Sequence, residues 1–249
     1  MAEALNNIRV CVLIPTYTNQ GTLGQVIQDV LQAGWPLWVI DDGSTDGTGR
    51  LLASRQDRVH VIRYQPNRGK AYALEQGFKA AYEAGYTHAV TMDADGQHLV
   101  QDLPALAAFA TAHPDTVVVG ARIQKDKKGQ KAGSAFANRF SNFWFHVQTA
   151  IPLQDTQCGL RLYPLRAVQG IRVLGRRYEG ELELLVRLAW RGWDEQSLPV
   201  HVYYPPAEER VSHFRPFTDF ARISVLNTLL TLLALLYGLP ARLIHRIGK

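Results

Sequence analysis

Two aspartates, Asp93 and Asp95, directly follow a short apolar segment and are separated by a single residue. Gln97 lies two positions further on. Carboxylate and amide oxygens at this spacing can ligate a hard divalent ion such as Mg²⁺ or Mn²⁺. A cation held in this way keeps positions open for the phosphate oxygens of a ligand. Acidic pairs are frequent in solvated loops. It is the position of this pair directly after a strand-like segment that indicates a metal site.

Three other strand-like segments of the first half are also followed by polar residues. Asp41 and Asp42 end one of them, and one of these carboxylates can accept a hydrogen bond from a base N–H or a ribose hydroxyl. Tyr17 follows another segment and can stack on a base. Arg68 and Lys70 stand at the start of a predicted helix, where free backbone N–H groups favour anions. Together these residues indicate a site for a phosphorylated ligand.

Apolar spacing predicts the elements that must position these side chains. Strand-like runs alternate with segments of helical periodicity. The predicted strands are residues 8–14, 37–40, 59–63, 88–92 and 116–120, and the predicted helices are 21–33, 45–54, 69–84 and 101–112. This alternation predicts an α/β protein with a mostly parallel sheet flanked by helices. Since ligands of an open parallel sheet bind beyond the carboxyl ends of its strands, the four polar segments should meet at one edge.

The second half of the chain has a less regular pattern. Its predicted helices are residues 134–148 and 179–190, and its predicted strands are 156–163 and 195–204. Residues 125–133 are polar and charged and contain glycine, which favours a mobile loop.

The segment 223–239 near the C-terminus contains no charged residue. It is shorter than the ~20 residues that usually span a bilayer, and Arg222 and Arg242 flank it. Its polar residues, among them Asn227 and Thr231, cluster on one side of a helix and leave leucines on the other. Three interpretations remain open: a helix packed on its own domain, an amphipathic helix in the plane of a membrane, and a short transmembrane anchor.

Composition narrows the function classes. The 249 residues are 47% hydrophobic and 20% charged, which excludes a disordered or fibrous protein. The net charge of +5 suggests nucleic acid, a membrane surface or a phosphorylated ligand as partner. With two cysteines and no predicted signal peptide, the expected location is the reducing cytoplasm. Neither a Walker A nor a G-x-G-x-x-G motif is found, which argues against a P-loop enzyme and a dinucleotide oxidoreductase.

The ordered motifs resemble those of the family 2 glycosyltransferases, which have a GT-A (Rossmann-like) fold. The chain is most similar to the dolichyl- and polyprenyl-phosphate mannosyl- and glucosyltransferase branch, over residues 8–204. The segments that carry the resemblance are PTYTNQGTL, VIDDGSTDGT, NRGKAYAL, TMDADGQH, DTQCGLRLY and YEGELELL. The resemblance implies a nucleotide-diphosphosugar donor, Mg²⁺ or Mn²⁺ as cofactor, and inversion at the anomeric carbon.

The resemblance also implies roles for matching residues on the donor side. Asp93, Asp95 and Gln97 match the motif that binds the metal and the diphosphate. The nucleotide contacts fall on Pro15, Tyr17, Asp41 or Asp42, Lys70 and Asp93. Two departures stand out: the family often has a carboxylate where this chain has Asn19, and the Q-x-x-R-W motif of processive synthases is absent. Transfer of a single sugar is therefore expected.

A hydroxyl acceptor would need a general base. Asp155 and Glu181 are the best candidates, with Glu179 and Glu183 as alternatives, because these residues lie in segments that match the family near the acceptor. A phosphate acceptor is already anionic, and in that case Asp155 orients it and Arg161 holds the phosphate.

The tail is expected to add charge and membrane affinity. Arg210, His213 and Arg215 can supply positive charge from a loop that closes over the donor. We divide the chain into residues 1–204, a GT-A catalytic domain, and residues 205–249, a basic loop plus a C-terminal amphipathic or membrane-associated helix. The expected acceptor is a polyprenyl phosphate or another membrane lipid at the inner face of the membrane, and no nucleic acid partner is expected. A nucleotidyltransferase that releases pyrophosphate and a catalytically silent membrane-bound scaffold remain alternatives.

Overall fold

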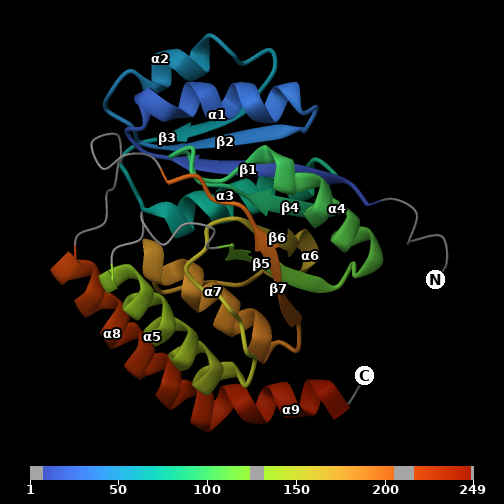
Figure 1. Ribbon diagram of the computed structural model, residues 1–249, viewed down its shortest axis with the longest axis vertical. Coiled ribbons are helices and arrows are strands. Elements are labelled where there is room, and N and C mark those ends of the chain that lie inside the picture. The colour runs from blue at the N-terminus through green and yellow to red at the C-terminus, as the bar shows by residue number, and fades with distance from the viewer. Residues whose placement is uncertain (1–7, 124–131, 205–215, 248–249) are drawn as a thin grey trace.

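A computed structural model of the protein describes residues 8–123, 132–204 and 216–247. Seven strands form one sheet in the order β3-β2-β1-β4-β6-β5-β7 (Figure 1). The strands are β1 (Val10–Thr16), β2 (Leu37–Asp42), β3 (His60–Tyr64), β4 (His88–Thr91), β5 (Thr116–Arg122), β6 (Arg161–Pro164) and β7 (Asp194–Val200). Only β6 runs antiparallel to its neighbours, β4 and β5. The predicted α/β class with a mostly parallel sheet is confirmed.

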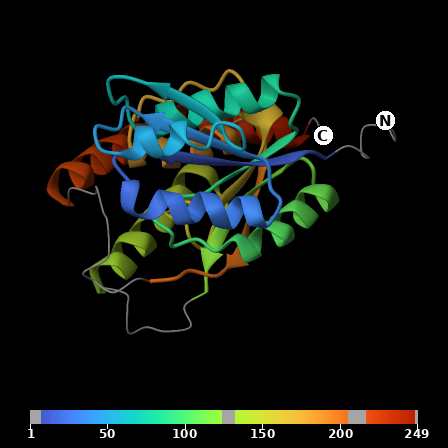
Figure 2. The same ribbon diagram turned by 90° about the horizontal axis from the view of Figure 1, so that it is seen from above.

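Helices cover both faces of this sheet. They are α1 (Gln20–Gln32), α2 (Thr48–Ala53), α3 (Lys70–Glu83), η2 (Val100–Asp102), α4 (Leu103–Ala112), α5 (Ala132–Thr149), α6 (Leu165–Val168), α7 (Tyr178–Trp190), α8 (Pro216–Leu233), the π-helical turn η4 (Ala234–Gly238) and α9 (Leu239–Ile247). Figures 1 and 2 show α1 and α4 on one face of the sheet and α3 and α6 on the other. The helices α5, α7, α8 and α9 gather at one end, at the bottom of Figure 1.

The core includes the inner strand β1, whose residues Cys11, Val12, Leu13 and Ile14 have no exposed surface. Helix α3 packs against β1 and β2 at close range, because a Cβ on Gly77 would lie 2.8 Å from Ile40 Cδ1. A strand that is buried on both faces needs an unbroken apolar run, which explains why the run at β1 was readable in the sequence.

Several predicted elements differ from the structure in their limits; for example, the predicted strand 195–204 ends at Val200. β2 does not end at residue 40 but includes Asp41 and Asp42, which pair in register with residues of β3. The predicted strand 156–163 was wrong over its first part, because β6 begins at Arg161. The carbonyls of Thr156 and Cys158 accept hydrogen bonds from the Arg161 side chain rather than from a neighbouring strand. The loop predicted at residues 125–133 falls mostly outside the described residues.

Candidate active site

The segments that follow β1, β2 and β4 meet at one edge of the sheet, which we call the strand-end edge. Thr16 at the end of β1 pairs in register with Asp41 of β2. The backbone N–H of Thr18 donates to Ser44 Oγ at 2.8 Å, which ties the first loop to the second. Thr22 Oγ1 donates to the Ala94 carbonyl at 2.7 Å, which ties α1 to the loop after β4. The sequence-predicted segments are therefore brought together as expected for parallel strands.

Lys70 joins the aspartate loop to helix α7. Its Nζ donates to Asp93 Oδ1 at 2.6 Å and lies 2.8 Å from Glu181 Oε2. His98 Nε2 lies 3.7 Å from the other Asp93 oxygen. Burial raises the pKa of Asp93, but the Lys70 ammonium and His98 outweigh it and hold that pKa well below its usual range. Asp93 is thus a carboxylate at neutral pH, as a ligand for a cation must be.

Asp95 faces the same region with a different environment. Its Oδ1 accepts a hydrogen bond from the Gln97 backbone N–H at 3.0 Å. Burial, followed by the charge of Asp93, raises the pKa of Asp95. The negative charge of Asp93 thus disfavours the charged form of Asp95, and a nearby cation would reduce this repulsion.

Hard oxygen donors suit Mg²⁺ or Mn²⁺. Within the described ranges, no group of three or more His, Cys, Asp or Glu side chains gathers as a metal site. Asp93, Asp95 and Gln97 as ligands of a cation stay a prediction.

Gly159 gives Asp93 its position. A Cβ on this glycine would lie 2.1 Å from Asp93 Oδ2 and 2.7 Å from its Cγ. Thr91 Oγ1 donates to the Gly159 carbonyl at 2.9 Å and holds the two segments together. Gly159 was not singled out in the sequence, although it lies inside a segment that carries the family resemblance.

Asp41 and Asp42 are both buried and are used by the protein itself. Asp41 accepts from the Ser44 backbone N–H at 2.9 Å and pairs with Arg63 at 3.1 Å. Each oxygen of Asp42 accepts a backbone N–H at 2.7 Å, one from Arg68 and one from Gly69. Asp42 therefore holds the loop that opens α3 and places Lys70. A nucleoside contact by either aspartate stays a prediction.

The loop that Asp42 holds requires glycine at position 69. Gly69 has φ +98°, and a Cβ there would lie 2.1 Å from the Arg176 carbonyl oxygen. The Ala71 N–H donates to that same carbonyl at 3.1 Å. The start of α3 is thus packed directly on the segment that precedes α7.

Asp155, one candidate base, is buried and paired with Arg122. Arg122 Nε donates to Asp155 Oδ2 at 2.5 Å, and Nη2 donates to Oδ1 at 2.9 Å. A bidentate pair of this kind fixes the carboxylate strongly. Arg122, at the end of β5, was not identified from the sequence as a site residue. Asp155 as a base or an orienting group stays a prediction.

The three glutamates of α7 have separate environments. Glu181 contacts Lys70, and its Oε1 lies 3.9 Å from Arg161 Nη1. Glu183 accepts from the Leu174 and Gly175 backbone N–H groups and from Arg187, all within the protein framework. Glu179 is buried at the start of the helix. Among the three, Glu181 is the one that reaches the lysine at Asp93.

Arg161 is 2% exposed and donates to the protein's own groups. Its acceptors are the carbonyls of Cys158, Thr156 and Glu181 and the Tyr163 hydroxyl. A direct contact with an acceptor phosphate stays a prediction, and the buried position does not favour it. The observed role is to hold Glu181 and the segment that carries Gly159.

The remaining predicted residues are placed in part. Pro15 is buried in β1, and Tyr17 beyond it is exposed. Arg210, His213 and Arg215 lie outside the described residues. The chain that leads toward them, however, crosses the aspartate loop, since the Tyr203 N–H donates to the Gln97 carbonyl at 2.8 Å and Val202 forms a β-bridge with His98.

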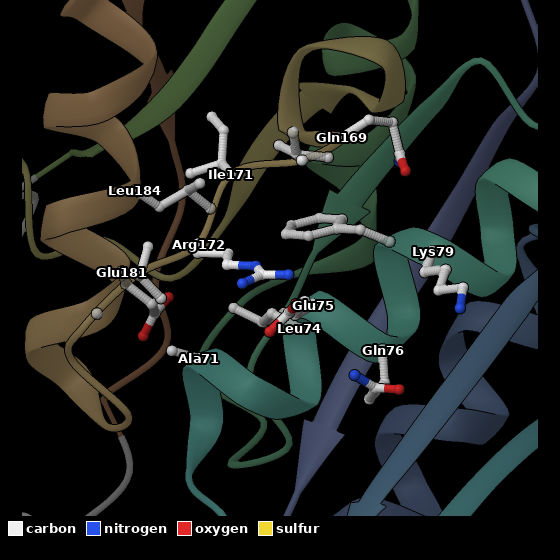
Figure 3. Close-up of a pocket in the computed structure, with 15 residues that line it drawn as sticks. Ala71, Leu74, Glu75, Gln76, Lys79, Gln169, Ile171, Arg172, Glu181 and Leu184 are labelled. Atoms are coloured by element: carbon white, nitrogen blue, oxygen red, sulfur yellow. The ribbon is translucent and has the colours of Figure 1, made fainter.

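A pocket of ≈ 260 Å³ lies between α3, α7 and residues 168–173 (Figure 3). Leu74, Ile171 and Leu184 give it apolar walls, and Arg172 points across it. Glu181 also lines this pocket, so its carboxylate lies between the pocket and Lys70.

Comparisons with known proteins show which proteins this chain is similar to. The chain is 26% identical over 215 residues to a UDP-N-acetylglucosamine–dolichyl-phosphate N-acetylglucosaminyltransferase of Methanococcus voltae, covering 78% of this chain and 86% of that protein. It is 29% identical over 206 residues to a polyprenol monophosphomannose synthase of Mycolicibacterium smegmatis, covering 77% and 76%.

The crystal structure of mannosyl-3-phosphoglycerate synthase from Rubrobacter xylanophilus shares the fold, with a TM-score of 0.63, 16% identity, and coverage of 90% of this chain and 73% of that one. The sequence model of glycosyl transferase family 2 matches residues 11–169. Since that match spans most of the sheet and all of the strand-end edge, the chain belongs to glycosyl transferase family 2.

Proposed function

We propose that the protein transfers one sugar, with inversion, from a nucleotide-diphosphosugar to a polyprenyl phosphate or a related membrane lipid, and that it depends on Mg²⁺ or Mn²⁺. The observation that carries the proposal is the placement of Asp93 against Lys70 at the strand-end edge, two residues before Asp95. The names of the two relatives, both transferases to polyprenyl-type acceptors, support the acceptor class.

Asp93 and Asp95 would hold the cation, with Gln97 as a further candidate ligand. When bound, the cation supplies positive charge against the negative charge that grows on the departing nucleoside diphosphate. The Lys70 ammonium, which contacts one oxygen of Asp93, would add positive charge beside the cation. His98 lies near the other Asp93 oxygen. Pro15, Tyr17 and the Asp41–Asp42 turn would form the nucleoside side of the site.

Glu181 is the better-placed candidate base of the two named from the sequence. It is buried and contacts the same Nζ atom as Asp93, so it lies close to the reacting region. With a phosphate acceptor little base help is needed, and Glu181 then acts by positioning Lys70.

We also propose that two segments of the chain have different roles. Residues 1–204 carry the transfer, and residues 205–249 bring the protein to the inner face of a membrane. The structure contains one helix long and apolar enough to cross a membrane, Arg222–His245, among the residues that it describes. Its 24 residues include the segment 223–239 that stood out in the sequence.

The test is an assay with a panel of nucleotide sugars, a short-chain polyprenyl phosphate, and Mg²⁺, Mn²⁺ or a chelator. The expected result is a glycolipid and one nucleoside diphosphate per transfer, lost on chelation. Release of pyrophosphate would identify a nucleotidyltransferase instead. Unchanged turnover after chelation would contradict the metal-dependent mechanism, and no turnover with any donor would favour a silent scaffold.

A further inference from the structure

The C-terminal helices α8 and α9 bury a line of mixed polar and apolar side chains against the protein and leave many leucines exposed. Their buried residues recur every three or four positions along one line, from Asn227 through Leu230, Ala234 and Gly238 to Arg242. A helix on a water-soluble surface turns an apolar stripe inward and polar residues outward, whereas in α8 and α9 the outward side is apolar as well.

Specific contacts fasten the inner line to the rest of the protein. Gln148 Nε2 of α5 donates to Thr231 Oγ1 and to the Asn227 carbonyl, both at 3.2 Å. Arg242 Nη1 of α9 donates to the Thr149 carbonyl at 2.6 Å. These contacts involve both helices of the α8–α9 unit, so the unit is attached at more than one place.

The middle of the unit packs at close range on α7. A Cβ on Gly238 would lie 2.2 Å from Trp190 Cε2. The Trp190 Nε1–H donates to the Gln148 carbonyl at 2.8 Å, so the same indole also supports α5. Pro240, which follows two residues later, has no amide hydrogen to continue a regular helical ladder, in keeping with the wider π turn at η4.

The outer face is almost purely apolar. Leu236 is 81% exposed, the largest value among the exposed apolar side chains of this face. The outer face consists of Val225, Leu229, Leu232, Leu235, Leu236, Tyr237, Leu243 and Ile244. Thr228, also exposed, donates its hydroxyl to the Ser224 carbonyl at 3.0 Å, so its donor is satisfied within the helix. A contiguous face of this kind marks a contact with another apolar phase.

A spanning orientation would conflict with the inner line. To cross a bilayer, the helix would have to leave α5 and α7 and place Asn227, Thr231 and Arg242 in hydrocarbon without their present partners. Buried polar groups without partners are costly there. The outer face needs an apolar phase on one side only, which an interface supplies.

Resting on the membrane contact in the proposed function, we propose that α8, η4 and α9 lie in the plane of the membrane surface, with the outer face in the acyl-chain boundary of one leaflet. The unit does not cross the bilayer. Exposed Arg222 and His245 stand at the two ends of its apolar stretch, and Arg222 suits anionic head groups. This orientation places the globular part flat against one leaflet and a lipid acceptor on the same side as the site.

The test is a depth measurement with full-length protein on vesicles of phosphatidylcholine and phosphatidylglycerol. Single cysteines at Val225→Cys, Leu236→Cys and Ile244→Cys carry an environment-sensitive fluorophore, and lipids with quenchers at defined depths report each position. The two native cysteines, Cys11 and Cys158, are buried, and the labelled unsubstituted protein gives their background. The expected result is one shallow depth for all three positions, reached from outside the vesicle.

A spanning helix would give different depths, with Leu236 near the bilayer centre and one end protected in the far leaflet, and would overturn the proposal. Labels that stay in water with vesicles present, or that are quenched only by a second copy of the chain, would overturn it as well.

A matched pair of variants separates this inference from the proposed transfer. Leu235→Asp with Leu236→Asp should lower vesicle partitioning by roughly tenfold or more. Tyr82→Asp on α3, an exposed apolar side chain far from this face in sequence, should leave partitioning unchanged. Release of nucleoside diphosphate with a short soluble acceptor should persist in both variants, so a loss of transfer alone would count against the function and not against the orientation.

Discussion

The strand-end edge and the C-terminal helices both bury polar side chains, but the groups that surround these side chains differ. At the edge, Asp42 and Glu181 are surrounded by backbone N–H groups and cations that compensate their charge. In the C-terminal helices the inner line carries the neutral amide of Asn227, which contacts Gln148 of α5, and the outer face exposes leucines. The comparison teaches that buried charges here are compensated by cations and backbone N–H groups, whereas a buried neutral amide pair holds a helix whose other side is apolar.

The largest effect is expected at Asp93. Asp93→Asn removes the carboxylate that Lys70 and His98 face and should reduce transfer by roughly 10³-fold or more, because the proposed cation would lose a charged ligand. The exposed Asp57→Asn serves as control. Turnover and metal affinity by calorimetry are measured together, and an Asp93→Asn protein that still transfers sugar at the normal rate would break the assignment of the edge.

Glu181→Gln tests whether the charge network extends from the edge to α7. Removing the charge that faces Lys70 should lower turnover by roughly 10²-fold. The matched control is Glu183→Gln, whose carboxylate holds the Leu174 and Gly175 N–H groups and should cost stability of about 1–3 kcal/mol with little change in turnover. Equal turnover losses in the two variants would mean that Glu181 is only a framework residue.

Gly159→Ala sharpens the role of close packing at the edge. The added methyl group meets Asp93 at 2.1 Å, so the carboxylate must shift and turnover should fall by up to roughly 10²-fold. Unfolding free energy should fall by about 1–3 kcal/mol. Gly21→Ala is the control, because nothing lies within 4 Å of its added Cβ. Normal metal affinity in Gly159→Ala protein would contradict the packing argument.

Asn227→Ala tests how the C-terminal helices are held on α5. Gln148 Nε2 loses a side-chain acceptor that lies 3.3 Å away, so stability should fall by about 1–3 kcal/mol. Urea unfolding of the full chain measures this change, with exposed Thr228→Ala as the matched control. An unchanged midpoint would show that the amide pair does not hold α8 on α5.

The smallest expected effect is a pH dependence of stability that comes from Glu195 of β7. The charges that act on Glu195 include Arg242 of the inner line and Arg161. Burial raises the pKa of Glu195 well above its ordinary value, despite the opposing charges of Arg242 and Arg161 and with a small addition from Asp194. The folded state therefore holds a proton that the unfolded state releases above about pH 4.5, and stability should fall as pH rises from there through the raised pKa.

Glu195→Gln should flatten this dependence. Thermal unfolding of both proteins from about pH 5 to about pH 9 measures the slopes, and parallel slopes would exclude Glu195 as the source.

The first half of the fold was predictable because its elements are local. Continuous apolar runs such as β1 and the helical spacing of α1 and α3 follow from the residues in one short window. The antiparallel strand β6 was harder to place: its limits depend on the Arg161 side chain, which takes up the carbonyls of Thr156 and Cys158. No pattern within residues 156–163 shows that interaction.

The sequence by itself determined the α/β class, the family and the gathering of the aspartate motifs at one edge, because parallel strands place their carboxyl ends together. Only the tertiary structure decided which polar groups are already engaged: Asp155 by Arg122, Asp42 by the start of α3, and Arg161 by three carbonyls.

The tertiary structure also decided which side of α8 faces the protein. The physical reason is the same in each case, since hydrogen bonds and ion pairs between residues far apart in the chain depend on packing that no local window contains.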